Sequence, residues 1–329
     1  MLDVAILGCG RWGMNHLSTL SILREEKLVN SIIVVDTSPS ARKSATLADE
    51  VKESIDGVDA DLVIIATPSK LHALQAKELM SQGYHVLVEK PLGCCESEAA
   101  QVLANAHENG RVIGVGLLLR FHPAVKLAKK MLSGGKLGRL ESLRFIRRTI
   151  RQAPSEGNVI ESLGVHAIDL ICHMLSEAEP SAVNVEGDRT ESRVILEFPH
   201  GIEALVDLGW GSNVERRTVT LVGSNASLRF DLDVHDKAIM ILDGKEIVLD
   251  CESNHSPLEA ELRHIIAGVE AHKAGVAWEA FPDYGAALRG VRWTEKQYKQ
   301  CLSQGHIEES NPFGHIMAGG PTTEESEPL

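Results

Sequence analysis

The feature that most constrains the fold is a glycine-rich turn at residues 8–13, which reads GCGRWG. It directly follows an apolar run and directly precedes a helical pattern. The first glycine permits a tight turn, the second lets a phosphate approach the backbone, and the third allows helix and strand to pack closely. Free N–H groups at the start of the helix favour anions. The turn therefore predicts a site for the pyrophosphate of a dinucleotide, made by Gly8, Gly10, Arg11, Trp12 and Gly13.

The next predicted strand supports this interpretation because it ends at Asp36. A carboxylate about 20 residues beyond such a turn accepts a hydrogen bond from the adenosine ribose and repels a 2′-phosphate. The sequence therefore favours NAD over NADP, although Arg42 and Lys43 lie close enough in sequence to soften that preference. The alternative is a packing turn followed by a capping aspartate, with no cofactor.

The first 120 residues alternate short apolar runs with helical patterns. Solidly apolar runs such as IIVV and LVIIA are typical of parallel strands that are buried on both faces. Strands are predicted at 2–7, 31–36, 61–66, 85–89 and 111–116, and helices at 12–27, 40–50, 70–82 and 96–109. Residues 1–120 are therefore predicted to form an α/β dinucleotide-binding domain of the Rossmann type, with a doubly wound parallel sheet.

The pattern changes after residue 120. Helices are predicted at 122–132, 160–175, 257–272 and 282–302, and short strands separated by turns such as PHG and DGKE occupy most of 140–249. This succession predicts, for residues 121–303, an α+β domain for substrate binding and oligomerisation, with a large, open, mostly antiparallel sheet. Residues 304–329 are polar and lack periodicity, so a disordered or loosely docked tail is expected there.

Charge and composition exclude several classes of function. The formal net charge of −13 opposes binding to nucleic acid or to an anionic membrane, and no apolar stretch is long enough to span a bilayer. The N-terminus shows no secretory leader, so a cytoplasmic protein is expected. None of the six cysteines lies in a CxxC pair, so reduced thiols are expected and no metal site is predicted.

A longer match lies at residues 64–92, which read IIATPSKLHALQAKELMSQGYHVLVEKPL. This segment resembles the glucose–fructose oxidoreductase / inositol dehydrogenase / rhizopine catabolism family. The similarity continues through RFHP at 120–123 and LGVHAID at 163–169, and it covers about residues 1–303. The matching residues of the first segment are Ala66, Thr67, Pro68, His72, Glu89, Lys90 and Pro91.

The resemblance implies an oxidoreductase with concrete site residues. Lys90 would lie between nicotinamide and substrate, and His166 would be the acid/base residue. The open sheet would pack against another subunit, giving a homodimer or homotetramer. The cofactor site would also include Thr67, Pro68, His72, Glu89 and Lys90.

Alcohol oxidation suits both residue types. Imidazole accepts a proton near neutral pH, and a fixed ammonium stabilises an oxygen that becomes anionic. Lys90 ends a predicted strand at the carboxyl edge of the sheet, where open α/β sheets bind ligands. Taken alone, Lys90 would be a solvated surface lysine and His166 a buried helix histidine. Their positions within the two motifs favour the catalytic interpretation.

Ser162, His166 and Asp169 share one face of a predicted helix. Asp169 is the third catalytic candidate: it either accepts a hydrogen bond from the imidazole and orients it, or it binds backbone or an arginine. Members of the family that resemble inositol dehydrogenase carry aspartate where this chain has Ser162. This departure argues against simple inositol as the substrate.

Arginines gather in the predicted substrate domain, at positions 144, 147, 148, 151, 216 and 217. Guanidinium groups bind phosphate and carboxylate, so the leading prediction is a nucleotide sugar or a sugar acid. Ion pairing at a subunit interface is the alternative. The candidates for substrate binding are Arg120, Arg148, Ser162 and Arg217.

Three functions are compatible with these features. The first is an NAD-dependent oxidoreductase that acts on CH–OH groups of a sugar derivative. The second is a sensor that binds a dinucleotide without catalysis, and the third is a glycosidase that uses tightly held NAD. The presence of both Lys90 and His166 favours an enzyme over a sensor.

Overall fold

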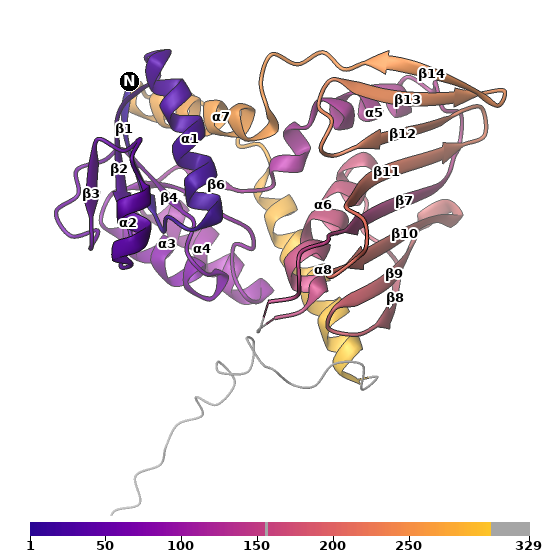
Figure 1. Ribbon diagram of the computed structural model, residues 1–329, viewed down its shortest axis with the longest axis horizontal. Coiled ribbons are helices and arrows are strands. Elements are labelled where there is room, and N and C mark those ends of the chain that lie inside the picture. Colours follow the sequence, from indigo (N-terminus) through magenta and orange to yellow (C-terminus); the bar gives the residue numbers. More distant parts are fainter. Residues whose placement is uncertain (155–156, 304–329) are drawn as a thin grey trace, which may run out of the picture.

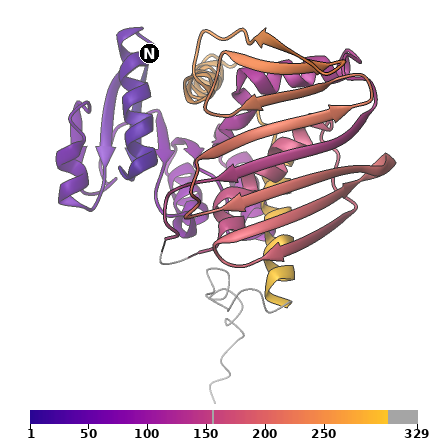
Figure 2. The same cartoon turned by 45° about the vertical axis from the view of Figure 1, so that its right-hand side comes forward.

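The computed structural model describes residues 1–154 and 157–303, so the predicted tail at 304–329 lies outside the described residues. Two sheets dominate the fold, and helices cover both faces of the first sheet and one face of the second (Figures 1 and 2). Among the described helices, none is long and apolar enough to cross a membrane.

The first sheet has six strands in the order β3-β2-β1-β4-β5-β6, and all neighbouring strands are parallel. β4 and β5 are buried throughout because helices cover both faces of the sheet. The predicted doubly wound parallel sheet is therefore confirmed. Its elements are β1 (Leu2–Leu7), α1 (Arg11–Glu25), β2 (Val29–Val35), α2 (Pro39–Ser44), β3 (Glu50–Lys52), β4 (Leu62–Ile65), α3 (His72–Ser81), β5 (His85–Val88), α4 (Glu96–Glu108) and β6 (Ile113–Val115).

The prediction of one helix over residues 40–50 is wrong. α2 begins after Ser38, whose hydroxyl accepts a hydrogen bond from the Ala41 N–H, and the helix ends at Ser44. Residues 50–52 instead form the edge strand β3, in which Val51 lies opposite Val34 of β2. Leu47 and Val51 are exposed, and only the small side chains of Ala41, Ala45 and Ala48 pack against the core, so little apolar burial would hold a longer helix there.

The second sheet has eight strands in the order β14-β13-β12-β11-β7-β10-β9-β8. The central strand β7 is parallel to β10 and antiparallel to β11, and the remaining pairs are antiparallel. The mostly antiparallel sheet predicted from the sequence is thus confirmed. Its strands are β7 (Leu140–Arg148), β8 (Ala182–Gly187), β9 (Glu191–Phe198), β10 (Ile202–Gly209), β11 (Arg216–Gly223), β12 (Ser227–Asp231), β13 (Lys237–Leu242) and β14 (Lys245–Asp250).

Four helices complete the described chain: α5 (Pro123–Ser133), α6 (Val165–Met174), α7 (Pro257–Lys273) and α8 (Tyr284–Ser303). α7 returns to the first sheet, where its Ile265 shares a core with Leu17 of α1 (Figure 1). α8 joins the two halves, because its Ala287 packs in the core with α3 and α4 while its Trp293 packs beneath the second sheet. Two helices from beyond residue 120, α7 and α8, therefore pack against the domain predicted for residues 1–120.

The predicted helix over 160–175 starts irregularly. Its first turn, Ile160–Gly164, is a π-helix, and α6 follows it directly. Such turns are rare and often occur at functional sites. Here the turn carries Glu161 and Ser162, which line a cavity together with Lys90.

Two buried histidines predict acid sensitivity of the fold. Nδ1 of His85 accepts a hydrogen bond from the Val112 N–H at 2.9 Å, and Nδ1 of His122 accepts from the Ala124 N–H at 3.2 Å. Burial lowers the pKa of each imidazole to about 4, below the 6.5 of an unfolded histidine. The unfolded chain therefore binds more protons between these values, and stability is lost as pH falls from about 6.5 towards 4.

We expect each imidazole to contribute on the order of 1–3 kcal/mol to this loss, measured as the fall in free energy of unfolding in urea between pH 7 and pH 5. His85→Gln retains an oxygen acceptor but cannot titrate, so it should flatten the pH dependence. The control is His107→Gln, at an exposed position on α4. An unchanged pH dependence in His85→Gln would refute this explanation.

Candidate functional site

The glycine-rich turn between β1 and α1 has the steric properties of a phosphate cradle. Gly8 has a φ of +92°, and a Cβ there would lie 2.9 Å from the Ala66 backbone. A Cβ on Gly13 would lie 2.0 Å from the Gly8 carbonyl oxygen, so helix and strand approach too closely for any side chain. A Cβ on Gly10, by contrast, would meet no atom within 4 Å. The turn therefore fits a pyrophosphate, because its middle glycine leaves the backbone open to a ligand.

α1 begins at Arg11, immediately after this turn, so its first N–H groups lie beside the open space. The Arg11 side chain is exposed, and its guanidinium carbon lies 5.8 Å from the centroid of the Trp12 ring. Both predicted residues thus lie at the helix N-terminus, where an anion would be held.

Asp36 follows β2 and connects it to the glycine-rich turn. Its Oδ2 accepts a hydrogen bond from the Cys9 N–H at 2.6 Å, and its Oδ1 accepts from the Ser38 N–H at 2.8 Å. Arg42 donates to the carbonyl oxygen of Asp36 at 2.6 Å and pairs with Glu53 at 3.4 Å. Because Arg42 is engaged there, its charge is partly balanced at the place where a ribose 2′-phosphate would need it.

Two other loops meet at the same carboxyl edge of the first sheet. One nitrogen of His72 lies 2.9 Å from the Thr67 carbonyl oxygen and the other lies 2.8 Å from that of Pro91, so the ring connects the loops after β4 and β5. Glu89 is buried and its Oε1 lies 2.9 Å from Nε2 of His16. Pro68 lines the neighbouring cavity. The fold thus brings the predicted cofactor residues together at one edge.

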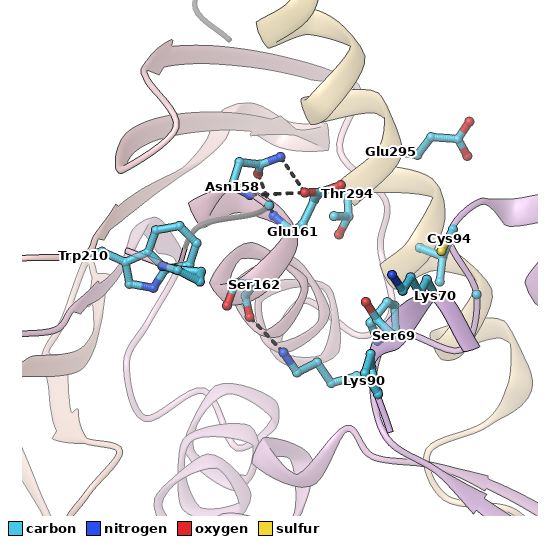
Figure 3. A pocket seen from close by; sticks show the side chains of 16 residues that line it. Ser69, Lys70, Lys90, Cys94, Asn158, Glu161, Ser162, Trp210, Thr294 and Glu295 are labelled. Atoms are coloured by element: carbon cyan, nitrogen blue, oxygen red, sulfur yellow. Dashed lines mark hydrogen bonds between the residues drawn. The ribbon is translucent and has the colours of Figure 1, made fainter. Parts of the chain in front are cut away.

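A cavity of about 480 Å³ lies beside this edge and receives residues from both halves of the chain (Figure 3). Lys90 reaches across from the end of β5, and its Nζ donates a hydrogen bond to the carbonyl oxygen of Ser162 at 2.8 Å. The Lys90–Pro91 peptide bond is cis. The other residues that line the cavity with side chains labelled in the figure are Ser69, Lys70, Cys94, Asn158, Glu161, Trp210, Thr294 and Glu295.

The electrostatic environment changes the basicity of Lys90 and of His166, which is buried and does not itself line the cavity. Burial, assisted by the charge of Arg147, lowers the pKa of Lys90 to about 8. Burial and the charges of Lys90 and Arg147 hold the pKa of His166 well below 6.5. At neutral pH Lys90 is therefore mostly cationic and His166 is neutral. This is the combination of protonation states that a proton acceptor beside a stabilising cation requires.

Most of the residues that line the cavity were not predicted as site residues, and Glu161, Asn158 and Trp210 are among them. Burial raises the pKa of Glu161 to about 7, and its Oε2 accepts a hydrogen bond from the side-chain amide of Asn158 at 2.7 Å. The indole Nε1 of Trp210 has no acceptor among the described residues. A π-turn cannot be recognised from residue spacing, so the sequence carries no signal that would have placed Glu161 and Asn158 in the wall.

Arg120 and Asp169 were predicted at the substrate and at the acid/base site respectively, and the structure shows that they bind each other. The Arg120 guanidinium donates to both oxygens of Asp169, at 2.7 to 3.1 Å, and also binds Glu177 at 2.9 Å. Arg120 and Asp169 are almost completely buried, and neither lines the cavity. The predicted partners of Asp169 were the imidazole, the backbone or an arginine, and the structure shows an arginine. Among the described residues, Asp169 makes its hydrogen bonds to Arg120 and none to His166.

Arg148 and Arg217 are also bound by carboxylates. Arg148 donates to Asp207 on the neighbouring strand β10 at 2.7 Å. Arg217 binds Glu215 at 2.6 Å and Asp233 at 3.0 Å. Neither arginine lines the cavity. In the described ranges 1–154 and 157–303, no group of three or more histidine, cysteine or acidic residues is placed to hold a metal ion.

Comparisons with known proteins place the fold in a family. Residues 2–117 match the model of an oxidoreductase family with an NAD-binding Rossmann fold. The chain is 28% identical over 322 residues to inositol 2-dehydrogenase from Mycolicibacterium smegmatis, which covers 88% of this chain and 93% of that protein.

Two solved structures have the same fold across both halves of the chain. UDP-N-acetylglucosamine 3-dehydrogenase from Acidithiobacillus ferrooxidans has a TM-score of 0.77 at 21% identity, covering 91% of this chain and 97% of that one. An inositol dehydrogenase homologue from Azotobacter vinelandii, complexed with NADH and myo-inositol, has a TM-score of 0.74 at 20% identity, covering 92% and 96%.

Residues 2–117 belong to the glucose–fructose oxidoreductase / inositol dehydrogenase / rhizopine catabolism family of oxidoreductases, and the relatives above are similar to the chain over both halves. The first sheet and its helices, with the glycine-rich turn after β1, form an NAD(P)-binding Rossmann domain. This membership agrees with the resemblance carried by the segment at 64–92.

Proposed function

We propose that the protein is an NAD-dependent oxidoreductase that interconverts a ring hydroxyl and the corresponding keto group of a sugar derivative. The observation that carries this proposal is the position of Lys90. Its ammonium extends from the cofactor edge of the first sheet into a cavity that the second half of the chain closes, and the Ser162 carbonyl oxygen holds it there.

In this proposal the bound dinucleotide supplies the hydride acceptor, and the protein supplies the remaining chemistry. His166, neutral because of its lowered pKa, accepts the hydroxyl proton. Lys90 stabilises the negative charge that then grows on the substrate oxygen. The Ser162 carbonyl oxygen fixes the direction of the Lys90 side chain. Asp169 takes no part, because Arg120 binds its carboxylate.

The choice of NAD over NADP is proposed to depend on Asp36. Its carboxylate stands beside the open glycine-rich turn, where it would accept from a ribose hydroxyl and repel a 2′-phosphate. The substrate class we favour is a nucleotide sugar or a sugar acid. The relatives differ in what their names state, namely inositol and UDP-N-acetylglucosamine, so the family alone does not choose between them.

A homodimer or homotetramer through the second sheet is also proposed. Buried side chains of α5, α6 and α8 pack against one face of that sheet. In Figure 2 no described helix covers the opposite face. A second copy of the chain would cover it. Sedimentation of the purified protein as a monomer at micromolar concentration would contradict this proposal.

The test of the function is a substrate survey by NADH absorbance, preceded by native mass spectrometry of the purified protein. We expect NADH formation with one class among nucleotide sugars, sugar acids and polyols. NAD retained through purification, with release of a reducing sugar and no net NADH, would favour the glycosidase. Retained NAD with no reaction at all would favour the sensor.

Asp36→Asn is expected to weaken the binding of NAD and to narrow its margin over NADP. The amide keeps one acceptor oxygen for the backbone N–H groups but removes the charge that repels a 2′-phosphate. Fluorescence titration with both dinucleotides measures the two affinities. Asp56→Asn, at an exposed position, serves as the control, and an unaltered preference in Asp36→Asn would show that Asp36 does not select the cofactor.

A further inference from the structure

Arg147 has an unusual environment for a charged residue. It lies at the end of β7, directly opposite Arg217 of β11 in the antiparallel register, and like charges in that position repel. Arg217 is bound by Glu215 and Asp233. Within the described part of the chain, the Arg147 guanidinium makes no hydrogen bond and no ion pair. The cation is therefore left without a partner that the described residues supply.

Other arginines add to this positive charge. Burial, with the charges of Arg217, Arg11 and Arg151, lowers the pKa of Arg147 to about 10, so it remains cationic at neutral pH. The same repulsion by Arg151, after burial, lowers the pKa of Arg11. A concentration of like charge in a partly desolvated place is unfavourable unless an anion balances it.

The carboxylates near the arginine cluster formed by Arg11, Arg147 and Arg151 are already bound to other groups. Asp233, the carboxylate that acts on Arg147, is held by Arg217 at 3.0 Å. Glu89, the carboxylate that acts on Lys90 and Arg11, faces His16 at 2.9 Å. These contacts leave the cluster open to an anion from outside the chain.

The cluster also acts on the two central residues of the site. Arg147 exerts the largest charge effect on Lys90 and also acts on His166. Arg148, the next residue, has its side chain on the other face of the strand, where Asp207 and Glu191 bind it. The two neighbours therefore differ in the face of the strand and in pairing: Arg148 has partners, and Arg147 has none among the described residues.

We propose that Arg147, together with Arg151, binds an anionic group of the substrate, a carboxylate or a phosphate, beside the Lys90–His166 pair. The inference rests on the proposed function and deepens it, because it assigns the recognition of the substrate's charge to these two arginines. Guanidinium groups make paired, charge-assisted hydrogen bonds to both kinds of anion.

The first experiment compares three compounds with the wild-type protein and NAD: a hexuronate, the neutral hexose of the same stereochemistry, and a nucleoside-diphosphate hexose. We expect turnover with an anionic compound and a KM for the neutral hexose at least tenfold higher. Preference for the hexuronate identifies a carboxylate on the ring, and preference for the nucleotide sugar identifies a diphosphate. Equal use of the neutral hexose would overturn the inference but leave the proposed function standing.

The second experiment compares Arg147→Gln with Arg148→Gln. Loss of a charge-assisted hydrogen bond is expected to raise the KM of the preferred anion roughly 10- to 100-fold in Arg147→Gln, with the affinity for NAD unchanged. Arg148→Gln should leave both values unchanged. Weaker NAD binding in Arg147→Gln would overturn the inference, because the arginines would then serve the cofactor pyrophosphate. An equal effect of Arg148→Gln would overturn it as well.

Calorimetric titration of the NADH complex with the hexuronate and the nucleotide sugar makes the test independent of turnover. The wild-type protein should bind one of them, and Arg151→Gln, at an exposed side chain, should weaken that binding even if Arg147→Gln does not fold. Absence of turnover with all compounds would contradict the proposed function alone. Absence of anion binding in the titration would contradict this inference.

Discussion

Replacing Lys90 with alanine is expected to lower kcat roughly 10²- to 10³-fold, about what the loss of one group that stabilises a developing oxyanion costs. The affinity for NAD should change little, because the glycine-rich turn follows β1 and Asp36 follows β2, whereas Lys90 follows β5. Steady-state kinetics with the substrate found in the survey, together with a direct titration of NAD, separates the two effects. Undiminished turnover would remove Lys90 from the mechanism.

The matched control for Lys90 is Lys70, which lines the same cavity but is exposed (Figure 3). Lys70→Ala should keep kcat within about twofold, because an exposed cation stabilises charge poorly in water. A loss as large as that of Lys90→Ala would mean that the positive charge of the cavity matters, rather than one placed ammonium.

The pH profile gives a second measure of the same residue. Since the pKa of Lys90 is lowered to about 8, its ammonium is present below that pH and is lost as pH rises through it. We expect kcat/KM of the wild-type protein to fall above about pH 8. In Lys90→Arg the side chain stays charged, so whatever activity remains should show no fall in this range.

Replacing Arg120 with methionine is expected to reduce the free energy of unfolding by about 3–5 kcal/mol, the usual cost of leaving one partner of a buried ion pair alone. Arg120 binds Asp169 and Glu177 at once. The Asp169 carboxylate has a pKa raised by burial, which Arg120 opposes, so without the arginine it must take up a proton or remain an unpaired buried charge. Urea denaturation followed by circular dichroism measures the loss.

The comparison variant is Arg139→Met, whose arginine side chain is 82% exposed and lies 3.8 Å from Glu141. We expect its free energy of unfolding to change by less than about 1 kcal/mol. The double variant Arg120→Met with Asp169→Asn should recover part of the loss, because the buried negative charge is gone. Equal stability of Arg120→Met and Arg139→Met, with a higher KM in Arg120→Met, would indicate that Arg120 binds the substrate and does not stabilise the fold.

Arg120 also shows why the site residues on α6 were hard to assign from the sequence. Asp169 and His166 lie on one helix face, and that spacing allows the carboxylate to orient the imidazole. The outcome depends on a residue from 49 positions earlier in the chain, because Arg120 binds Asp169 from the segment that leads into α5. A contact between distant segments leaves no trace in local periodicity.

The arginines of β7 illustrate a different limit. Their number in the sequence indicates anion binding, and alternation along a strand places neighbours on opposite faces. Only the register with β10 and β11 decides that Arg148 meets Asp207 and that Arg147 meets Arg217. The sequence therefore predicted Arg148 as a substrate residue. In the structure Asp207 binds Arg148, and Arg147 is the arginine without a partner among the described residues.

By itself, the sequence determined the parallel first sheet, the mostly antiparallel second sheet, the glycine-rich turn and the family of residues 2–117, because these depend on local periodicity, on steric demands of single glycines and on one continuous motif. The tertiary structure alone decided which charges are paired, which residues form the cavity wall, and that α7 packs on the first sheet. The physical reason is that burial and ion pairing depend on distances between segments far apart in the chain, which side-chain spacing along one segment does not specify.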